Sequence, residues 1–234
     1  DTIASSVSRE TETLLGRESI CRGYVMIPSK REIQLTPEEF QLLSGASDED
    51  MGRLEVYVSL LRKWQKNINL VSKDSLVDVW RRHVLDSAQL SSLIGPQTMT
   101  VADIGTGAGF PGMVLAIIKA EQDTKVHLIE SNERKCAFLR EVSLATKADV
   151  VIHNKRTEEL QDLSVDLVVS RAVSSVEKLL QYAVPLLKKD GHCLLLKGKK
   201  WRDELTQAQI KWIIKETVIQ SLSDPSGKIL KLEE

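Results

Sequence analysis

The chain contains little cysteine, and its cysteines indicate neither cross-links nor a metal site. Its 234 residues include three cysteines, Cys21, Cys136 and Cys193, which lie far apart in the sequence. An odd, scattered set with no C-x-x-C pair favours neither a disulfide framework nor a zinc centre. We therefore expect no bound metal and a cytoplasmic location, where thiols stay reduced.

Long apolar runs are also missing. A membrane-spanning helix needs roughly 20 consecutive apolar residues, and no stretch of this chain approaches that length. Residues 1–6 have neither the positive charge nor the apolar segment of a signal peptide. We expect a protein that does not associate with membranes.

Neither sign of charge dominates. The sequence has 32 Lys and Arg against 33 Asp and Glu, a net charge of −1, with 42% hydrophobic and 28% charged residues. This composition is typical of a soluble globular protein. A nucleic acid would have to be bound through local basic patches, because the molecule has no overall positive field.

The most informative stretch is VADIGTGAGFPG at residues 101–112. An apolar run ends at Asp103, four glycines follow within eight positions, and an apolar helix begins near Met113. A strand, a glycine loop and a helix in that order form a ligand-binding turn of a doubly wound α/β sheet. Without a Cβ the backbone can turn tightly and approach a ligand, and the helix N-terminus offers free N–H groups.

The details of this loop favour S-adenosylmethionine over a dinucleotide. Gly107, Gly109 and Gly112 match the pattern GxGxxG, but the first glycine after the strand is Gly105, so the match starts two residues late. Asp103 would crowd a pyrophosphate but could hold a cation. S-adenosylmethionine carries a sulfonium and an ammonium and no phosphate. The alternative is a glycine-rich turn with no ligand.

A second acid, Glu130, ends the next expected strand, 18 residues beyond Gly112. A carboxylate at that place can accept hydrogen bonds from both hydroxyls of a ribose. NAD and S-adenosylmethionine share this ribose, so Glu130 indicates an adenosine ligand without deciding between them. The alternative is a solvated charge at a strand end.

The sequence divides into three parts. Residues 1–34 lack sustained periodicity, and we expect a loose N-terminal extension there. Residues 35–95 read as a helical layer, and residues 96–234 as an α/β domain. We expect 35–234 to form one compact unit.

The helical layer is predicted from caps and from apolar spacing. Thr36 is an expected N-cap, followed by Pro37 and two acids in the first turn. A second helix begins at Asp48 and carries apolar residues at helical spacing: Leu54, Val58, Leu61 and Trp64. A third helical stretch, 76–93, has the apolar face Val77, Trp80, Val84, Leu85 and Ala88.

The rest of the chain alternates strands and helices. Strands are expected at 101–104, 126–130, 150–154, 165–170 and 192–197, and helices at 111–120, 133–146, 176–187 and 201–214. Residues 216–222 and 228–232 are predicted to pair as a hairpin. A parallel sheet closed by a hairpin is the arrangement expected of a class I methyltransferase.

Six segments carry a family resemblance: RKWQKNINLVS at 62–72, RHVLDS at 82–87, DIGTGAGFPG at 103–112, Ser131 with Lys135 and the pair at 138–139, SRA at 170–172, and KG at 197–198. In this order they resemble the RsmG (GidB) family, the 16S ribosomal RNA guanine-N7 methyltransferases, over roughly 36–234. The resemblance implies a class I, Rossmann-like methyltransferase sheet with an N-terminal helical layer. It also implies S-adenosylmethionine as cofactor and guanine 527 of 16S rRNA as methyl acceptor.

The resemblance further implies a cofactor site. Gly105 and Phe110 would line the pocket from the glycine loop, Glu130 would bind the ribose, and Thr157 and Glu158 would flank the adenine. The remaining expected cofactor residues are Arg156 and, from the loop itself, Asp103, Gly107 and Gly109. Thr157 stands where the family usually has Ala, and Glu130 where it often has Asp.

The expected chemistry needs no general base. Guanine N7 has an in-plane lone pair and no proton at neutral pH, so we expect catalysis by proximity and alignment. Arg or Lys is the usual donor at the O6/N7 edge of guanine and would orient the base. The candidates for substrate contact are Arg82, His83, Lys135, Arg171 and Lys197.

Several of these residues have plainer interpretations. His83 could instead be a hydrogen-bonded helix residue that fixes Asp86 or a loop. Lys63, Lys66 and the basic cluster 197–202 could bind phosphates or form a solvated face. Trp64 and Trp80 are interpreted as core residues rather than base-stacking platforms.

We expect the partner to be 16S rRNA or the small ribosomal subunit, and the chain to be a monomer. Three alternatives remain open on the residues alone. They are a class I methyltransferase acting on another substrate, a non-enzymatic module that binds an adenosine ligand, and a nicotinamide dehydrogenase.

Overall fold

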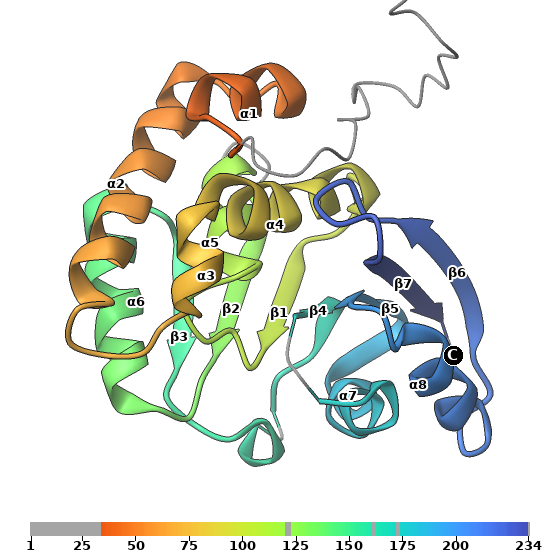
Figure 1. Ribbon diagram of the computed structural model, residues 1–234. Coiled ribbons are helices and arrows are strands. Elements are labelled where there is room, and N and C mark those ends of the chain that lie inside the picture. The colour runs from red at the N-terminus through yellow and green to blue at the C-terminus, as the bar shows by residue number, and fades with distance from the viewer. Residues whose placement is uncertain (1–33, 120–122, 161, 172–173, 234) are drawn as a thin grey trace, which may run out of the picture.

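The computed structural model describes residues 34–119, 123–160, 162–171 and 174–233. Its centre is a seven-stranded sheet with the strand order β3-β2-β1-β4-β5-β7-β6 (Figure 1). The first five strands are parallel: β1 (Thr100–Ile104), β2 (Lys125–Ile129), β3 (Val150–His153), β4 (Val165–Ser170) and β5 (Leu187–Lys197). The hairpin β6 (Lys215–Gln220) and β7 (Lys228–Glu233) closes the sheet, with β7 antiparallel to β5. The predicted parallel sheet with a closing hairpin is confirmed.

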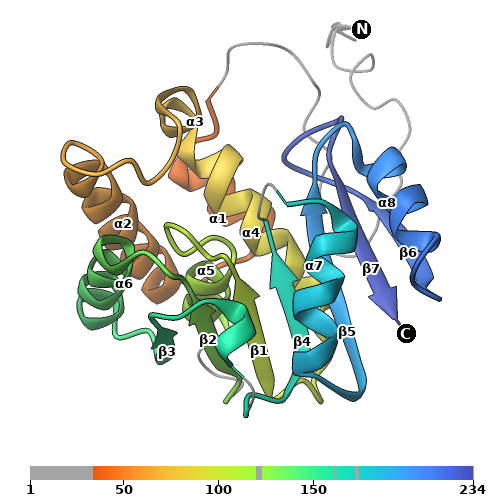
Figure 2. The ribbon, with the colours of Figure 1, turned by 90° about the horizontal axis from the view of Figure 1, so that it is seen from below.

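Helices cover both faces of the sheet. The helical layer contains α1 (Pro37–Ser44), α2 (Asp48–Trp64), α3 (Lys73–Val77), the π-helix η1 (Trp80–Leu85), α4 (Asp86–Ala88) and the 3₁₀-helix η2 (Gln89–Leu93). The remaining helical elements are α5 (Gly112–Ile118), α6 (Glu133–Thr146), η4 (Thr157–Glu159), α7 (Val176–Ala183), η5 (Val184–Leu186) and α8 (Trp201–Gln209). Seen from below, α2, α5 and α6 lie together, while α7 and α8 lie by β4, β5 and β7 (Figure 2).

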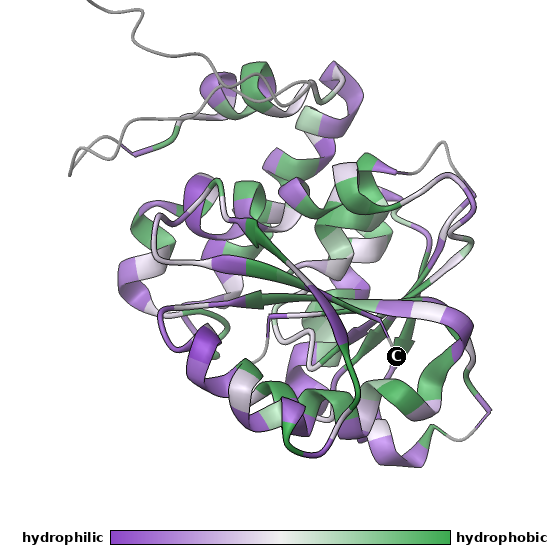
Figure 3. Ribbon diagram, turned by 90° about the vertical axis from the view of Figure 1, so that its right-hand side faces the viewer, coloured by the Kyte–Doolittle hydropathy of each residue, from purple (hydrophilic) through white to green (hydrophobic). Residues whose placement is uncertain are grey.

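Alternating side chains of the strands feed two separate cores. In β2, Leu128 belongs to the core shared with α2, α5 and α6, whereas the next residue, Ile129, belongs to the core under α7 and α8. In β5, Leu194 and Leu195 divide in the same way. This is the period-two pattern of a sheet buried on both faces, and Figure 3 shows apolar colour on strands and on helices around them, with polar segments between.

The start of the helical layer matches its predicted caps. The Thr36 hydroxyl accepts from the Glu39 N–H, and the Glu39 side chain accepts from the Thr36 N–H, a capping box. Trp80 is buried and packs on Phe40 with ring centroids 5.4 Å apart. Trp64 is partly buried, and its Nε1 donates to Glu141 at 2.9 Å. Both tryptophans therefore belong to the packing of the fold, as interpreted from the sequence.

The prediction of one continuous helix over residues 76–93 is wrong. It is broken into the end of α3, the π-helix η1, the short α4 and the 3₁₀-helix η2. The Val77 side chain, assigned to the apolar face, is 59% exposed. The wider turn of η1 shifts the helical phase, so that one regular 3.6-residue periodicity cannot describe the whole stretch.

Two further helix ends were predicted wrongly. The helix predicted at 176–187 ends as α7 at Ala183, followed by the single turn η5 that contains Pro185, and β5 already begins at Leu187. The helix predicted at 201–214 ends at Gln209, and Ile213 is 94% exposed. Pro185 has no backbone N–H with which to continue the α-helical hydrogen bonds, and Leu187 is fixed instead by pairing with Val165 of β4.

In the part of the chain that the structure describes, no helix is long and apolar enough to cross a membrane, and no three His, Cys, Asp or Glu side chains gather as a metal site. Cys136 and Cys193 are buried free thiols, and burial raises the pKa of Cys193 to about 12. Cys21 and nearly all of the predicted extension 1–34 lie outside the described residues.

Candidate active site

The glycine loop connects β1 to α5 at the carboxyl end of the sheet. Gly105, Gly107 and Gly109 all have positive φ angles, of 66°, 60° and 96°. The N–H groups of Gly105 and Thr106 both donate to the carbonyl of Ile129 at the end of β2, at 3.0 and 3.1 Å. The loop is therefore fastened to the neighbouring strand rather than projecting freely.

Asp103 holds the same loop from inside. Its Oδ2 accepts from the Thr106 hydroxyl at 2.5 Å and from the Gly112 N–H at 2.8 Å, and the residue is fully buried. Its Oδ1 has no hydrogen-bond partner among the described residues. Burial raises the pKa of Asp103 to about 6, although the two hydrogen bonds act in the opposite direction.

Gly109 and Phe110 face the helical layer. A Cβ on Gly109 would lie 2.6 Å from the Tyr57 hydroxyl oxygen and 2.9 Å from the Met113 Cβ. The Phe110 ring is stacked between Tyr57 and His83, with centroid distances of 5.1 and 4.8 Å. Both residues were predicted to contact the cofactor. In the structure, the Phe110 side chain and the space where a Gly109 side chain would lie are instead packed against α2 and η1.

A cavity of about 160 Å³ lies beside this loop at the ends of β1 and β2. It is lined by five of the predicted cofactor residues, Gly105, Glu130, Arg156, Thr157 and Glu158, together with Ile104, Ile129, Ser131, Lys155, Ser174, Leu179 and Tyr182. Asp103, Gly107, Gly109 and Phe110 do not line it. The fold therefore gathers around one cavity five residues that the sequence analysis had assigned to the same site, although they are far apart in the chain.

Glu130 is held rigidly at the edge of this cavity. Its side chain accepts from the Gly107 N–H at 3.2 Å and from the Asn132 N–H at 2.8 Å, and Glu130 is 9% exposed. Lys135, predicted to contact the substrate, lies here instead, with Nζ 3.9 Å from Glu130 Oε2. These contacts set the carboxylate beside the loop backbone.

The donor and acceptor set of this cavity fits the adenosyl group of S-adenosylmethionine. The side chains of Ile129, Leu179 and Tyr182 offer apolar surface for an adenine ring. The Glu130 carboxylate can accept from ribose hydroxyls, and the glycine-loop backbone can approach the ligand closely.

A second, larger cavity of about 500 Å³ lies next to the first. It is lined by four of the five predicted substrate-contact residues, Arg82, His83, Arg171 and Lys197, and by Asp86, Glu204, Ser223, Asp224 and Lys228 among others. Lys197 marks the boundary between the cavities, because its Nζ donates at 2.6 Å to the carbonyl of Ser174, which lines the first cavity. The Lys197 side chain is only 4% exposed and pairs with Glu204 at 2.7 Å.

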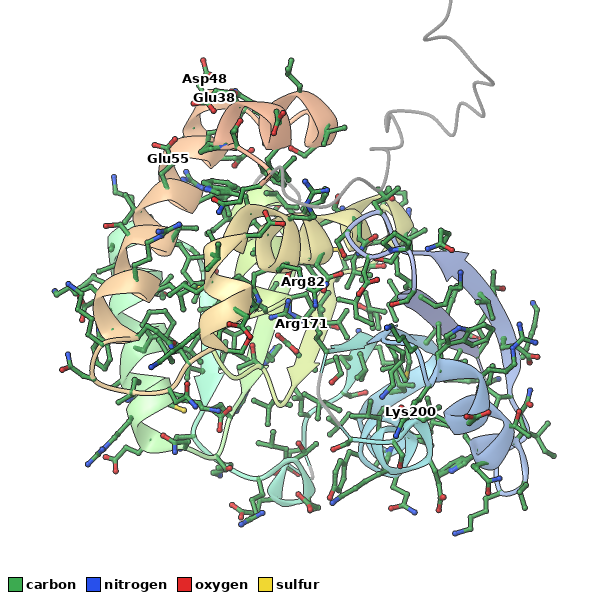
Figure 4. All side chains as sticks on the ribbon, in the orientation of Figure 1. Glu38, Asp48, Glu55, Arg82, Arg171 and Lys200 are labelled. Atoms are coloured by element: carbon green, nitrogen blue, oxygen red, sulfur yellow. The ribbon has the colours of Figure 1, made fainter. Side chains whose placement is uncertain are left out.

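Arg171, which directly follows β4, lies in the wall of the larger cavity, beside Arg82 (Figure 4). Its Nη1 donates to the Arg82 carbonyl at 2.9 Å and lies 3.4 Å from Asp86 Oδ2. Its Nη2 lies 2.8 Å from His83 Nδ1, and its Cζ lies 5.0 Å from the centroid of the Phe110 ring. Arg82 itself pairs with Asp224 at 3.1 Å.

His83 is a buried member of this group. Its Nε2 lies 2.8 Å from the Ser75 hydroxyl oxygen, so both ring nitrogens have protein partners. Burial and the neighbouring Arg171 and Arg82 lower the pKa of His83 to about 3. The ring is neutral at physiological pH, which agrees with the interpretation of His83 as a hydrogen-bonded helix residue.

Sequence reasoning missed the contribution of the β6–β7 loop. Ser223 donates to Asp86 at 2.5 Å, and Asp224 pairs with Arg82, so this loop closes the larger cavity. The segment 223–227 was predicted only as a turn. Its Ser-Asp-Pro-Ser-Gly sequence satisfies turn chemistry equally well without a site, so no local signal distinguished it.

The fold and the site together define the class of the protein. The strand order, the antiparallel β7, the glycine loop after β1 and the carboxylate after β2 are those of a class I S-adenosylmethionine-dependent methyltransferase. The structure of a SAM-dependent methyltransferase from Aquifex aeolicus superimposes with a TM-score of 0.54 at 20% identity, covering 68% of this chain and 95% of that one.

Sequence comparison then identifies the family. The family model described as GidB, rRNA small subunit methyltransferase G, matches residues 50–231. The ribosomal RNA small subunit methyltransferase G of Paramagnetospirillum magneticum is 47% identical over 198 residues, covering 85% of this chain and 95% of the relative. The protein of the same name from Rhodospirillum rubrum is 44% identical over 200 residues, covering 86% and 98%. The chain belongs to the rRNA small subunit methyltransferase G family, which confirms the resemblance stated above.

Proposed function

We propose that this chain transfers a methyl group from S-adenosylmethionine to N7 of a guanine in 16S rRNA, at position 527 by its family resemblance. One observation carries the proposal. In a chain of this family, a cavity lined by Gly105 and Glu130 adjoins a larger cavity lined by Arg82, Arg171 and Lys197. One cavity suits the methyl donor, and the other suits an anionic, flipped-out acceptor nucleotide.

The cofactor would be held by the residues around the smaller cavity. Glu130 would accept from the ribose hydroxyls, while Thr157, Glu158 and Arg156 would surround the adenine. The backbone of Gly105 and Gly107, with the buried Asp103 behind it, would lie along the methionine end. When bound, the cofactor supplies an electrophilic methyl group on a sulfonium.

The acceptor base would be oriented rather than deprotonated. Guanine N7 carries a lone pair at neutral pH, so alignment of N7 with the methyl group is the main requirement. The guanidinium of Arg171 is the donor best placed for guanine O6, because it lies in the wall of the larger cavity. Lys197, fixed between the cavities, would keep the methyl donor and the acceptor base at a constant position relative to each other.

The RNA backbone would be bound by exposed cations around the larger cavity. Lys199 and Lys200 are exposed directly after Lys197, and the Arg202 guanidinium lies 4.8 Å over the Trp201 ring. Such contacts position an RNA without reading its sequence. The acidic residues Glu38, Asp48 and Glu55 lie over α1 and α2, away from Arg82 and Arg171 (Figure 4). We further propose that the chain acts as a monomer in the cytoplasm, on 16S rRNA or the small ribosomal subunit.

The test is tritium transfer from labelled S-adenosylmethionine to 16S rRNA and to small subunits from cells that lack this activity, followed by nucleoside analysis and mapping. The proposal expects label as 7-methylguanosine at one position. The Arg171→Gln variant is expected to transfer at least 100-fold more slowly while binding S-adenosylhomocysteine normally. Cofactor binding with no label in either RNA substrate would move the function to another methyl acceptor or to a binding module.

A further inference from the structure

The hydrogen bonds around His83 can be assigned a direction at every step. Arginine has donors and no acceptor, so Nδ1 of His83, 2.8 Å from Arg171 Nη2, must be the unprotonated acceptor. The ring hydrogen is then on Nε2, which donates to Ser75 Oγ at 2.8 Å. The Ser75 hydroxyl in turn donates to the Ser72 carbonyl at 2.9 Å. The series of hydrogen bonds ends on the backbone carbonyl of Ser72, the N-cap of α3, and fixes the tautomer.

Packing fixes the plane of the same ring. His83 is 6% exposed and stacks on Phe110, and the Arg171 guanidinium lies over that phenyl ring as well. With both nitrogens engaged, His83 has no group left for a substrate. The hydrogen bond between its Nδ1 and the Arg171 guanidinium is the contact that joins the His83 ring to a cation of the larger cavity.

The guanidinium has further anchors on the opposite side. Nη1 contacts the Arg82 carbonyl and Asp86 Oδ2, and Asp86 Oδ1 is held by Ser223 at 2.5 Å and by Gln89 at 3.0 Å. Arg171 is therefore held directly by residues of the η1–α4 segment. Those residues are held in turn by Ser75 of α3 and by Ser223 of the β6–β7 loop. A donor held in its working orientation before the ligand binds loses no further freedom on binding.

We propose that His83 is a positioning residue for the methyl transfer: its neutral imidazole presets the Arg171 guanidinium that orients the acceptor base, and it makes no contact with the base itself. The inference rests on the proposed function, because it assigns the wall of the larger cavity to the acceptor guanine. The lowered pKa of His83 supports a ring that stays an acceptor throughout physiological pH.

Two variants of His83 distinguish the contribution of the aromatic ring from that of the acceptor nitrogen Nδ1. His83→Phe keeps an aromatic ring on Phe110 and removes the acceptor, whereas His83→Asn loses the ring but places an amide oxygen near the Nδ1 position. His83→Phe is expected to lower kcat about 10- to 100-fold with unchanged affinity for S-adenosylhomocysteine, and His83→Asn is expected to recover most of the loss. His192→Phe, a half-buried histidine of β5 outside both cavities, is the matched control and is expected to retain full activity.

A double-mutant cycle with Arg171→Gln tests that the effect runs through the guanidinium. Adding His83→Phe to Arg171→Gln is expected to cause no further loss of kcat, because the partner is already gone. Multiplying losses in the double variant, or full activity of His83→Phe, would overturn the inference. Urea unfolding of each variant separates these outcomes from failure to fold.

Imidazole ¹⁵N NMR of the free protein gives a readout that does not depend on the substrate. It is expected to report His83 as protonated at Nε2 only, with an Nδ1 shift that changes in Arg171→Gln. If the wild-type protein labels no RNA, the proposed function fails while this spectrum still decides the His83–Arg171 bond. A ring protonated at Nδ1 would refute the positioning role whatever the substrate is.

Discussion

At the scale of single residues, Asp166 shows how one carboxylate joins two strands and a loop. Its Oδ2 accepts from the N–H groups of Met99 and Thr100 at 3.0 and 2.9 Å, and Lys188 Nζ lies 2.8 Å from Oδ1. Burial alone would raise the pKa of Asp166, but these bonds lower it to about 2. The group therefore stabilises the fold above its unfolded pKa of about 4, and this stabilisation is lost as the pH falls towards 2.

We expect Asp166→Asn to lower the free energy of unfolding at pH 7 by about 1–2 kcal/mol, because a charged acceptor of several bonds is removed. The difference from the wild type should shrink as urea unfolding is repeated from pH 4 towards pH 2. Asp190→Asn, an exposed acid at the same end of the sheet, is the control and should stay within about 0.5 kcal/mol. An Asp166→Asn penalty that does not change with pH would contradict the ionic explanation.

Gly107 is the residue on which cofactor binding is most sharply tested. Its φ is +60°, its N–H donates to Glu130, and a Cβ there would meet only the Gly105 carbonyl oxygen at 3.8 Å. Gly107→Val is therefore strained by its backbone conformation rather than by a clash, at about 1–2 kcal/mol. We expect the variant to fold and to lose binding of S-adenosylhomocysteine in calorimetry. Gly52→Ala on α2, where a Cβ meets nothing within 4 Å, is the control. Wild-type affinity of Gly107→Val would refute the placement of the methionine end along the backbone of Gly105 and Gly107.

At the scale of elements, α2 supports the glycine loop from behind. The Tyr57 hydroxyl donates to the Ala108 carbonyl, and its ring stacks on Phe110 and packs near Phe138. The residue is fully buried, and burial raises the pKa of Tyr57 well above its ordinary value. The helical layer is thus part of the wall that shapes the ligand loop.

We expect Tyr57→Phe to destabilise the protein by about 1–2 kcal/mol, because the Ala108 carbonyl is left without its buried donor. Since that carbonyl lies between Gly107 and Gly109, affinity for S-adenosylhomocysteine should fall as well. Urea unfolding and calorimetry on the same preparation measure both effects. Lower stability with unchanged affinity would mean that the loop keeps its shape without α2.

The elements also explain what the sequence could and could not predict. Strands β1, β2 and β4 are short apolar runs because most of their residues are buried on one face of the sheet or the other. That signal is local, so these strands and the residues at their ends, including Glu130 and Arg171, were located from the sequence. The start of β5 was missed because the exposed residues Lys188 and Lys189 look like a loop, and only pairing with β4 extends them into a strand. Partners such as Ser223 and Asp86, 137 positions apart, meet only through the tertiary fold.

At the scale of the whole molecule, one core joins the helical layer to the sheet. Phe40, Leu54 and Leu61 belong to the same cluster as Leu128 and Leu194. The prediction that residues 35–234 fold as one unit stays a prediction, and this shared core supports it. A single calorimetric transition would agree with it.

The charges of the whole molecule nearly cancel, so RNA binding must depend on local cations. We expect the variant carrying Lys199→Ala and Lys200→Ala to bind 16S rRNA more weakly and with a shallower salt dependence, by about 0.7–0.9 in slope for each phosphate that these lysines no longer neutralise. Lys189→Ala, exposed near the opposite end of β5, is the control. Equal slopes for both variants, from filter binding over a salt series, would place the RNA elsewhere.

The two edges of the sheet carry a consequence for association between copies. The edge strand β3 has four residues and is followed by the exposed Asn154 and Lys155, while the edge strand β6 begins with the exposed Lys215 and Glu216. Short strands and charged side chains discourage another strand from adding to an open edge. Neither edge of the sheet therefore favours the addition of a strand from another copy. We expect concentrated solutions of the protein to resist assembly into fibrils or extended sheets.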